Sequence, residues 1–242
     1  MSTPVVVDNE VVIESGRVKN PQTETSSQVP VSAPSKGPET GILSELPPLP
    51  DPSTFTKAPE LTTLGNTFIK KASSAVVING DNGPRFIPHG LIEEAQPMEV
   101  LLRHPHPGII RYHGCQVQRG YVTGLVLDEY SHNLNEYLKD GIGSVDRGSF
   151  MDALESAVHH LHSLGWAHND LNPSNIMIND DGMPIVIDFS SCQKFGDELT
   201  ISGGTEGWME GDVDDYTTSK KSHDIYALVK IRAWLDDPTF DI

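Results

Sequence analysis

Two polar stretches in the second half of the chain carry side chains that can do chemistry together. The run 168–175 reads HNDLNPSN and presents a carboxylate at Asp170 and an amide at Asn175. A second carboxylate, Asp188, directly follows the apolar run 185–187. Two hard oxygen ligands such as Asn175 and Asp188, at the ends of neighbouring strands, can hold Mg²⁺ that bridges the phosphates of a nucleotide. Asp170 then stays free to orient an attacking hydroxyl and to accept its proton.

A purely structural interpretation exists for some of these residues. Asp170 and Asn175 can close a polar turn through hydrogen bonds to the backbone. Asp188 is harder to explain in this way, because a carboxylate beside a buried strand needs a partner or a metal. His168 is typical of a histidine packed against the core, and we do not expect it to act as an acid or a base.

Patterns of apolar residues predict the elements that position these groups. Short strands are expected at 67–70 (TFIK) and 75–78 (AVVI). Apolar residues at helical spacing then predict a helix over about 91–102, in which Pro97 implies a kink or a late start. Two strands follow, at 109–115 and 121–127.

The second half of the chain is richer in helix. A short helix is expected over 134–138, and a longer one from about 149 to 164 with one apolar face. The runs 176–178 and 185–187 predict a β-hairpin, and a last helix begins near Ser222. A strand-rich part followed by a helix-rich part predicts an α+β fold in two lobes.

Asp170, Asn175 and Asp188 also stand in a known arrangement. The pattern Asp-x-x-x-x-Asn, followed by a second Asp after one hairpin, resembles the catalytic loop and metal-binding motif of protein kinases. The resemblance continues in order over most of residues 67–236. It implies a two-lobed kinase-like fold, ATP and Mg²⁺ as cofactors, and a protein substrate that accepts phosphate on serine or threonine.

The flanking motifs imply further roles by the same resemblance. Lys70 ends a stretch, TFIK, that is similar to the Val-Ala-Ile-Lys strand, which makes it the candidate for the α- and β-phosphates. Glu94 lies where the family places the acid that pairs with that lysine. The run 127–130 (LDEY) resembles the hinge that contacts adenine, and it implies nucleotide contacts at Glu129 and Tyr130.

Three more sites complete the likeness. The run 106–110 (HPGII) resembles the His-Pro-Asn-Ile-Val run of kinases, and 204–208 (GTEGW) resembles the end of an activation segment. Asp224 resembles the buried aspartate that braces the catalytic loop. The combination is most similar to the compact protein-kinase-like proteins of filamentous fungi.

The sequence departs from the family pattern at several positions. No Gly-x-Gly-x-x-Gly precedes Lys70, so we expect the N-lobe to lack the glycine-loop hairpin that covers the phosphates. Asn169 replaces the usual arginine, which is the partner of a phosphorylated activation loop. Asn172, assigned to the catalytic loop, replaces a lysine that faces the transferred phosphoryl group, and this should slow transfer. Because the chain stops at Ile242, we expect a shortened helical C-lobe.

Composition divides the chain into a tail and a domain. Residues 1–60 hold ten of the 18 prolines and a single aromatic residue, Phe55. A segment with so few large apolar groups cannot offset its ordering entropy, so we expect a disordered tail over 1–60. The kinase-like domain is expected over 66–242, with the N-lobe at about 66–127 and the C-lobe at about 131–242.

Charge and cysteine content narrow the partners and the compartment. The formal net charge of −17 repels phosphate backbones and anionic lipid, so we expect no nucleic-acid or membrane partner. No apolar run approaches the roughly 20 residues of a membrane span. Two cysteines suit a reducing compartment. We therefore expect a soluble intracellular protein, cytoplasmic or nuclear.

Three functions remain open. The first is an ATP-dependent protein kinase-like phosphotransferase acting on serine or threonine. The second is a pseudokinase or binding module, which the missing glycine motif and Asn172 favour. The third is a small-molecule phosphotransferase of the aminoglycoside- or choline-kinase type, which shares the His-x-Asp-x-x-x-x-Asn loop. The runs 106–110 and 204–208 are more similar to protein kinases than to this third class.

Overall fold

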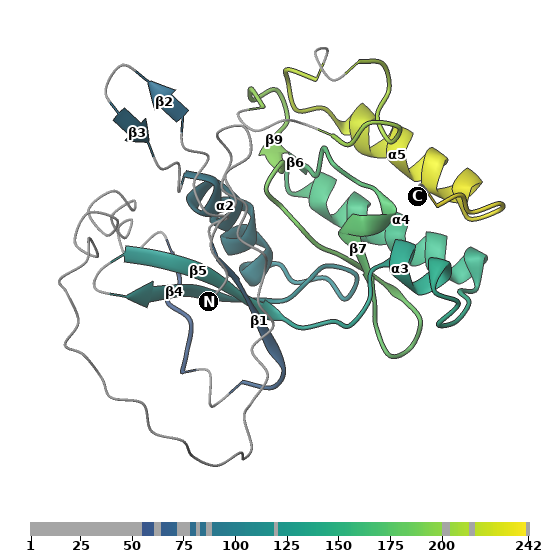
Figure 1. Cartoon of the computed structure of the whole chain (residues 1–242), viewed down its shortest axis with the longest axis horizontal. Coiled ribbons are helices and arrows are strands. Elements are labelled where there is room, and N and C mark those ends of the chain that lie inside the picture. The colour runs from purple at the N-terminus through teal and green to yellow at the C-terminus, as the bar shows by residue number, and fades with distance from the viewer. Residues whose placement is uncertain are drawn as a thin grey trace, which may run out of the picture.

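The computed structural model shows a strand-rich lobe beside a helix-rich lobe, as the sequence predicts (Figure 1). It describes residues 55–60, 64–71, 78–80, 83–85, 89–118, 121–199, 204–212 and 216–240. Most of the strand predicted at 75–78 lies outside the described residues. Ile78 itself begins a short strand, β2 (Ile78–Gly80), which pairs with β3 (Gly83–Arg85).

The smaller lobe is built on a three-stranded antiparallel sheet. Strand β5 (Tyr121–Asp128) lies in its centre, with β1 (Thr67–Lys71) on one side and β4 (Tyr112–Gln118) on the other. Strand β1 pairs with β5 along its whole length. The sheet therefore fixes the backbone of Lys70, which lies on β1.

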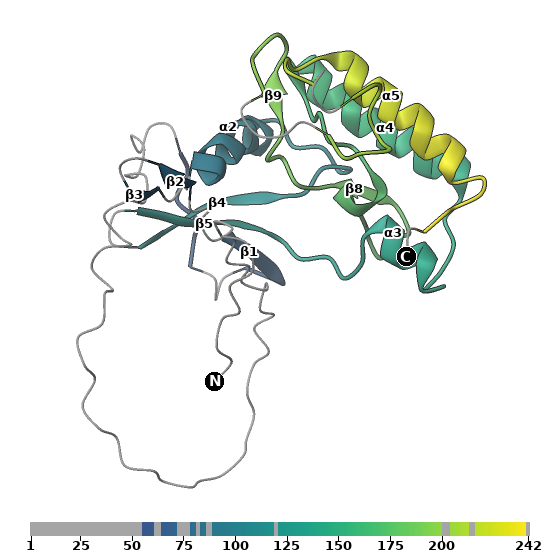
Figure 2. The same ribbon diagram turned by 45° about the horizontal axis from the view of Figure 1, so that its top comes forward.

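Helix α2 (His89–Arg103) packs against this sheet (Figure 2). Its buried apolar residues recur at helical spacing, and they are Leu91, Ala95, Met98 and Leu101. The helix begins at His89 and contains Pro97 in its interior, so the expectation of a late start is wrong. Two of its acidic residues, Glu94 and Glu99, are buried as well.

The larger lobe contains three helices in its described part, and the sequence predicts each of them. They are α3 (Leu134–Lys139), α4 (Arg147–Ser163) and α5 (Lys221–Trp234). Helix α4 starts at Arg147, two residues before the predicted start near 149, and the side chain of Asp146 caps it by accepting the Ser149 N–H at 3.0 Å. Helices α4 and α5 lie side by side (Figures 1 and 2). Of the helices that the structure describes, none is long and apolar enough to cross a membrane.

Short strands frame the loop at 168–175. Strand β6 (Trp166–Ala167) precedes the loop and pairs with β9 (Gln193–Lys194). Strand β7 (Ile176–Ile178) follows the loop and pairs with β8 (Pro184–Val186), which confirms the predicted hairpin. A short 3₁₀ turn, η2 (Pro173–Asn175), leads into β7. The loop is therefore anchored by a β-ladder at each end.

The strand predicted at 109–115 begins later, at Tyr112. Its first two apolar residues turn to the other lobe, where Ile109 forms a bridge with Val186 and the Ile110 N–H donates to the Val186 carbonyl at 3.0 Å. Both isoleucines are buried in this position. The run 109–110 thus joins the two lobes and does not extend the sheet.

The end of the stretch predicted to be disordered belongs to the folded lobe, which corrects the boundary at residue 60. The Cys115 N–H donates to the Thr56 carbonyl at 2.7 Å, and the Ala58 N–H donates to the Cys115 carbonyl at 2.9 Å. Gly114 makes this approach possible, because a Cβ atom there would lie 2.6 Å from the Ala58 nitrogen. Phe55 is buried in the core. The remaining residues of the predicted tail, 1–54, lie outside the described residues.

This docking predicts a large effect for Phe55. We expect Phe55→Ala to lower the free energy of unfolding by about 3 kcal/mol, because a buried aromatic ring is replaced by a cavity. Phe68→Ala is the matched control, because Phe68 is 47% exposed on β1. This variant should lower the free energy of unfolding by less than about 1 kcal/mol. Urea unfolding followed by tryptophan fluorescence measures both. A loss below about 1 kcal/mol for Phe55→Ala would contradict a contribution of Phe55 to the core.

Candidate active site

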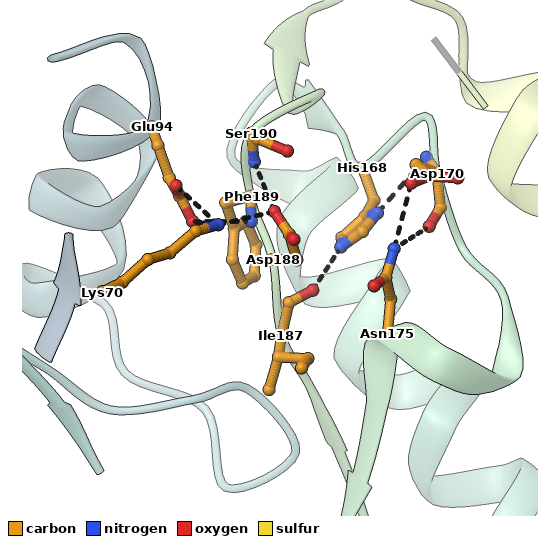
Figure 3. A network of polar contacts seen from close by, with 9 residues as sticks. All are labelled: Lys70, Glu94, His168, Asp170, Asn175, Ile187, Asp188, Phe189 and Ser190. Carbon is orange, nitrogen blue, oxygen red and sulfur yellow. Dashed lines mark hydrogen bonds and ion pairs between the residues drawn. The ribbon is translucent and has the colours of Figure 1, made fainter. Parts of the chain in front are cut away.

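A lysine from β1, a glutamate from α2 and an aspartate from the chain after β8 meet in one place (Figure 3). The Nζ atom of Lys70 lies 2.8 Å from a carboxylate oxygen of Glu94 and 2.8 Å from Oδ1 of Asp188. Asp188 is 118 positions from Lys70 in the sequence, so only the fold brings them together. The ammonium group of Lys70 thus pairs with two carboxylates, one from each lobe.

Burial and charge oppose each other in this group. Burial would lower the pKa of Lys70, but Glu94 and Asp188 outweigh it and raise that pKa. Burial would raise the pKa of Asp188, but Lys70 and the Ser190 N–H hold it at about 2. Burial raises the pKa of Glu94, against the opposing effects of Lys70 and the Phe189 N–H. Lys70 is therefore a cation and Asp188 an anion at neutral pH.

The backbone at Asp188 turns sharply. Its φ angle is +58°, in the left-handed region that Asp and Asn tolerate better than other non-glycine residues. After the turn, the Phe189 N–H donates to Oε1 of Glu94 at 3.1 Å, and the Ser190 N–H donates to Oδ1 of Asp188 at 3.2 Å. The Phe189 side chain is fully buried. Helix α2 therefore holds both the lysine and the backbone that follows the aspartate.

On the other side, a buried carboxylate braces the loop 168–175. Asp224 on α5 is completely buried, and it accepts the backbone N–H groups of His168 at 2.9 Å and Asn169 at 2.8 Å. It also bonds Nε2 of His162 at 2.7 Å. The start of the loop is thus held by an acceptor from a distant helix.

The imidazole of His168 links this loop to the strand before Asp188. Its Nδ1 accepts the Asp170 N–H at 3.3 Å, so Nε2 carries the proton and donates to the Ile187 carbonyl at 2.9 Å. The ring is fully buried and packs edge-on against Phe189, with ring centroids 5.2 Å apart. These contacts agree with the structural role predicted for His168.

Asp170 is surrounded by neutral donors. Its Oδ1 accepts the Thr205 hydroxyl at 2.7 Å and Nδ2 of Asn172 at 3.2 Å. Its Oδ2 accepts Nδ2 of Asn175 at 3.0 Å. Among the described residues, Asp170 has no ion pair. The amide of Asn172 therefore occupies a place next to the carboxylate without adding charge there.

Two oxygen atoms face the space between Asp188 and Asn175. Figure 3 shows the amide oxygen of Asn175 on the side where Asp188 lies, and one carboxylate oxygen of Asp188 turned away from Lys70. No described residue donates a hydrogen bond to Asn175 Oδ1 or Asp188 Oδ2. Both atoms are hard donors of the kind that Mg²⁺ prefers.

The chain's contribution to such a site is small. In the part of the chain that the structure describes, no group of three or more His, Cys, Asp or Glu side chains is placed to hold a metal ion. Mg²⁺ in phosphate-transferring sites is bound by one or two carboxylates together with substrate phosphates and water. Asn175 and Asp188 therefore fit a magnesium ion that is held jointly with a nucleotide.

The predicted hinge residues lie apart from this group. Glu129 and Tyr130 lie on the connection from β5 to α3. Glu129 is exposed, and its N–H donates to the Asn66 carbonyl at 3.2 Å, whereas Tyr130 is half-buried. No hydrogen bond or ion pair between described residues links either of them to Lys70 or Asp188. Their contact with a nucleotide stays a prediction.

The structure thus brings together six of the predicted site residues in two adjoining clusters. The first cluster contains Lys70, Glu94 and Asp188, and the second contains Asp170, Asn172 and Asn175. Thr205 joins the second cluster, and no site role was predicted for it. Its signal was the motif GTEGW, in which a hydroxyl follows a glycine whose φ is +89°.

Comparison with known proteins identifies a family whose model matches this chain. Residues 69–235 match the family model described as "Protein kinase domain". This match includes both clusters of the site. It also covers the helices α2, α3, α4 and α5.

Individual relatives are similar at modest identity. A serine/threonine-protein kinase/endoribonuclease IRE1 from Hypocrea jecorina is 33% identical over 118 residues, which cover 44% of this chain and 9% of that protein. Mitogen-activated protein kinase kinase 9 from Arabidopsis thaliana is 27% identical over 154 residues, 62% of this chain and 48% of that protein. The DNA damage-responsive serine/threonine-protein kinase RqkA from Deinococcus radiodurans is 34% identical over 141 residues, which cover 54% of this chain and 21% of that protein. The chain spans less than half the length of these relatives.

Proposed function

Because the chain belongs to the protein kinase domain family, we propose that it transfers the γ-phosphate of Mg·ATP to a serine or threonine hydroxyl. The observation that carries this proposal is the position of Lys70 between Glu94 and Asp188, beside the loop that presents Asp170 and Asn175. In phosphoryl transfer the protein supplies mainly positioning and charge, and these residues can supply both. The likeness to compact kinase-like proteins of filamentous fungi stays a prediction.

Each side chain has a part in this proposal. Lys70 binds the α- and β-phosphates, and Glu94 holds the ammonium group in place. Asn175 and Asp188 hold Mg²⁺, which neutralises charge on the phosphates when it is bound. Asp170 orients the acceptor hydroxyl and takes its proton. Glu129 and Tyr130 lie on the connection assigned to adenine.

Asn172 limits the expected rate. Developing negative charge on the transferred group is best stabilised by a fixed cation, and that electrostatic contribution is usually the largest in catalysis. Asn172 offers only a neutral amide, which is already bonded to Asp170 and to the Thr205 hydroxyl at 3.1 Å. We therefore expect slower transfer than in a kinase that carries lysine at this position.

Binding of Mg·ATP is the first test of the proposal. A ligand that binds only the native state raises stability by about 2.7 kcal/mol at 100 times its dissociation constant. We expect millimolar Mg·ATP to raise the thermal unfolding midpoint of the wild-type chain. Asp188→Asn should lose this rise, because it weakens both the magnesium site and the partner of Lys70.

The control for this variant is Asp181→Asn. Asp181 is an exposed carboxylate in the turn between β7 and β8, outside both clusters, so this variant should keep the full effect of Mg·ATP. An unchanged midpoint for the wild-type chain with Mg·ATP would contradict the proposal. An equal rise in wild type and Asp188→Asn would contradict the role of Asp188.

A second candidate is a binding module without catalysis. Two features favour it: no glycine-rich motif precedes Lys70, and both oxygens of Asp170 already accept internal hydrogen bonds. This candidate predicts that Asp170 can be replaced without loss of cellular function. The fold alone does not decide between the two candidates.

A further inference from the structure

The side chain of Asn169 makes a dense set of hydrogen bonds that the proposed chemistry does not use. It is 3% exposed, and its Nδ2 lies 3.0 Å from the carbonyl oxygens of Ala167 and Ser191 and 3.0 Å from Oγ of Ser219. Its Oδ1 lies 3.1 Å from Nδ1 of His223. One amide thus contacts four groups from three separate parts of the chain.

The chemistry of these partners fixes the orientation of the amide. Carbonyl oxygens only accept hydrogen bonds, so the NH₂ group must face Ala167 and Ser191. The amide oxygen then faces His223, whose Nδ1 must carry a proton. The Ser219 hydroxyl accepts from Asn169 and donates to the Gln193 carbonyl at 3.0 Å. The NH₂ group of Asn169 has two hydrogens for its three acceptors, so these three contacts share them.

These contacts fasten both ends of the segment 188–220 to the catalytic loop. Ser191 lies near the start of the segment, and Ser219 lies at its end, two positions before α5, which carries His223. Between the ends, the Gly196 N–H donates to the Ser219 carbonyl at 2.9 Å, and the Ser219 N–H donates to the Asp197 carbonyl at 2.8 Å. We call the group Asn169, Ser191, Ser219 and His223 the amide clasp.

The amide clasp contains no charged pair. Its centre is a neutral amide, and burial lowers the pKa of His223, so this imidazole is neutral near pH 7. Its Nδ1–H donates to Asn169 whether the ring is neutral or protonated, and the ring stacks on that of Tyr216 with centroids 3.9 Å apart. A phosphorylated activation segment is instead held by a phosphate paired with a cation.

The amide clasp is also directly connected to the chemistry. Asn169 immediately precedes Asp170, and its φ angle is +63°, a conformation that asparagine tolerates. Its backbone N–H is fixed by Asp224. The side chain of Asn169 therefore holds the segment, and its backbone sets the direction of Asp170.

We propose that the amide clasp, and not a phosphate, holds the two described ends of this segment, 188–199 and 216–220, against the catalytic loop, which makes Asn169 a positioning residue for Asp170. The consequence for catalysis rests on the proposed function, but the attachment of the segment by the amide clasp is a property of the fold. It implies that these two ends take up their arrangement without phosphorylation.

Two substitutions separate the amide from the backbone conformation. Asn169→Gly keeps the positive φ angle and removes all four side-chain contacts. Asn169→Asp keeps the shape but places a carboxylate oxygen against the carbonyl oxygens of Ala167 and Ser191. Ser219→Ala removes one arm of the amide clasp. Thr217→Ala is its matched control, because Thr217 is exposed two positions away on the same segment.

The decisive measurement is hydrogen exchange, by NMR, on protein treated with a broad phosphatase. In the wild-type chain we expect the amides of Gly196, Leu199 and Ser219 to stay protected. In Asn169→Gly and Asn169→Asp we expect their exchange to be at least about 10-fold faster, with α4 unchanged, because the segment opens locally. Ser219→Ala should show a smaller acceleration and Thr217→Ala none. Loss of protection in dephosphorylated wild type, or unchanged exchange in Asn169→Gly, would overturn the proposal.

Steady-state kinetics then test positioning. For an active wild-type enzyme, we expect Asn169→Gly to lower kcat by about 10-fold or more and to leave the KM for ATP within about 2-fold, because the nucleotide contacts lie in the other cluster. Phosphatase treatment should leave the wild-type rate within about 2-fold. A rate that disappears with dephosphorylation contradicts the amide clasp. A wild-type chain without any transfer contradicts the proposed function, and the exchange data still decide the amide clasp.

Discussion

Asp170→Asn is expected to reduce the rate of γ-phosphate transfer from Mg·ATP by about 10² to 10⁴-fold, the usual contribution of a positioned acid–base group. Asparagine keeps the size of the side chain but cannot accept the proton of the attacking hydroxyl. It also places an NH₂ group among donors, since Thr205, Asn172 and Asn175 all donate to the native carboxylate. Initial rates with γ-labelled ATP and a mixture of serine and threonine peptides measure the change.

Two controls make this result specific. Ser174→Ala removes an exposed hydroxyl from the same loop, and we expect it to keep the wild-type rate. Asp170→Asn itself should keep most of the stabilisation by Mg·ATP, because the two oxygens that face the magnesium site belong to Asn175 and Asp188. A rate within twofold of wild type would remove Asp170 from the chemistry and favour the binding module.

The elements that the sequence predicts well are those whose apolar period is local. Helix α4 buries Phe150, Leu154, Ala157, Val158 and Leu161, the residues that its 3.6-residue period places on one face. The hairpin of β7 and β8 is carried by two apolar runs around a polar turn. These patterns need no information from the rest of the chain.

The errors in the fold arise where a distant partner decides the structure. The run 109–110 has the composition of a strand, but its partner is Val186 in the other lobe. Residues 55–58 lie in a proline-rich stretch, yet they pair with β4 because Gly114 lets the two backbones approach. Strands β6 and β9 have two residues each, too few for any periodicity. Local composition cannot show any of these contacts.

The candidate site likewise contains residues that the sequence predicts and partners that only the fold reveals. Side chains in a fixed local spacing, such as Asp170 and Asn175, are visible in the sequence. Their partners are not, because Thr205 reaches Asp170 from 35 positions away and Ser219 reaches Asn169 from 50. The replacement at Asn169 was visible as a lost cation, but its new contacts required the fold. A motif thus predicts which groups react and leaves open what holds them.

Asp224→Ala is expected to lower the free energy of unfolding by about 4 kcal/mol. Asp224 is completely buried and accepts two backbone N–H groups and the His162 imidazole, which also is buried. Removing the acceptor leaves these donors without a partner away from water, and breaking buried charged networks costs about 3–5 kcal/mol. Asp224→Asn should lower the free energy of unfolding by about 2 kcal/mol, because its NH₂ group faces at least one of the same donors and cannot accept from it. Urea unfolding measures both variants.

Asp152→Asn is the matched control, since it changes an exposed carboxylate on α4 and should shift stability by less than about 0.5 kcal/mol. A loss below about 1 kcal/mol for Asp224→Ala would mean that water or a rearranged side chain replaces the acceptor. The two clusters should also respond differently in this variant. Lys70 and Glu94 do not contact Asp224, so the folded fraction of Asp224→Ala should still be stabilised by Mg·ATP. Its transfer rate per folded molecule should fall, because the backbone that directs Asp170 has lost its brace.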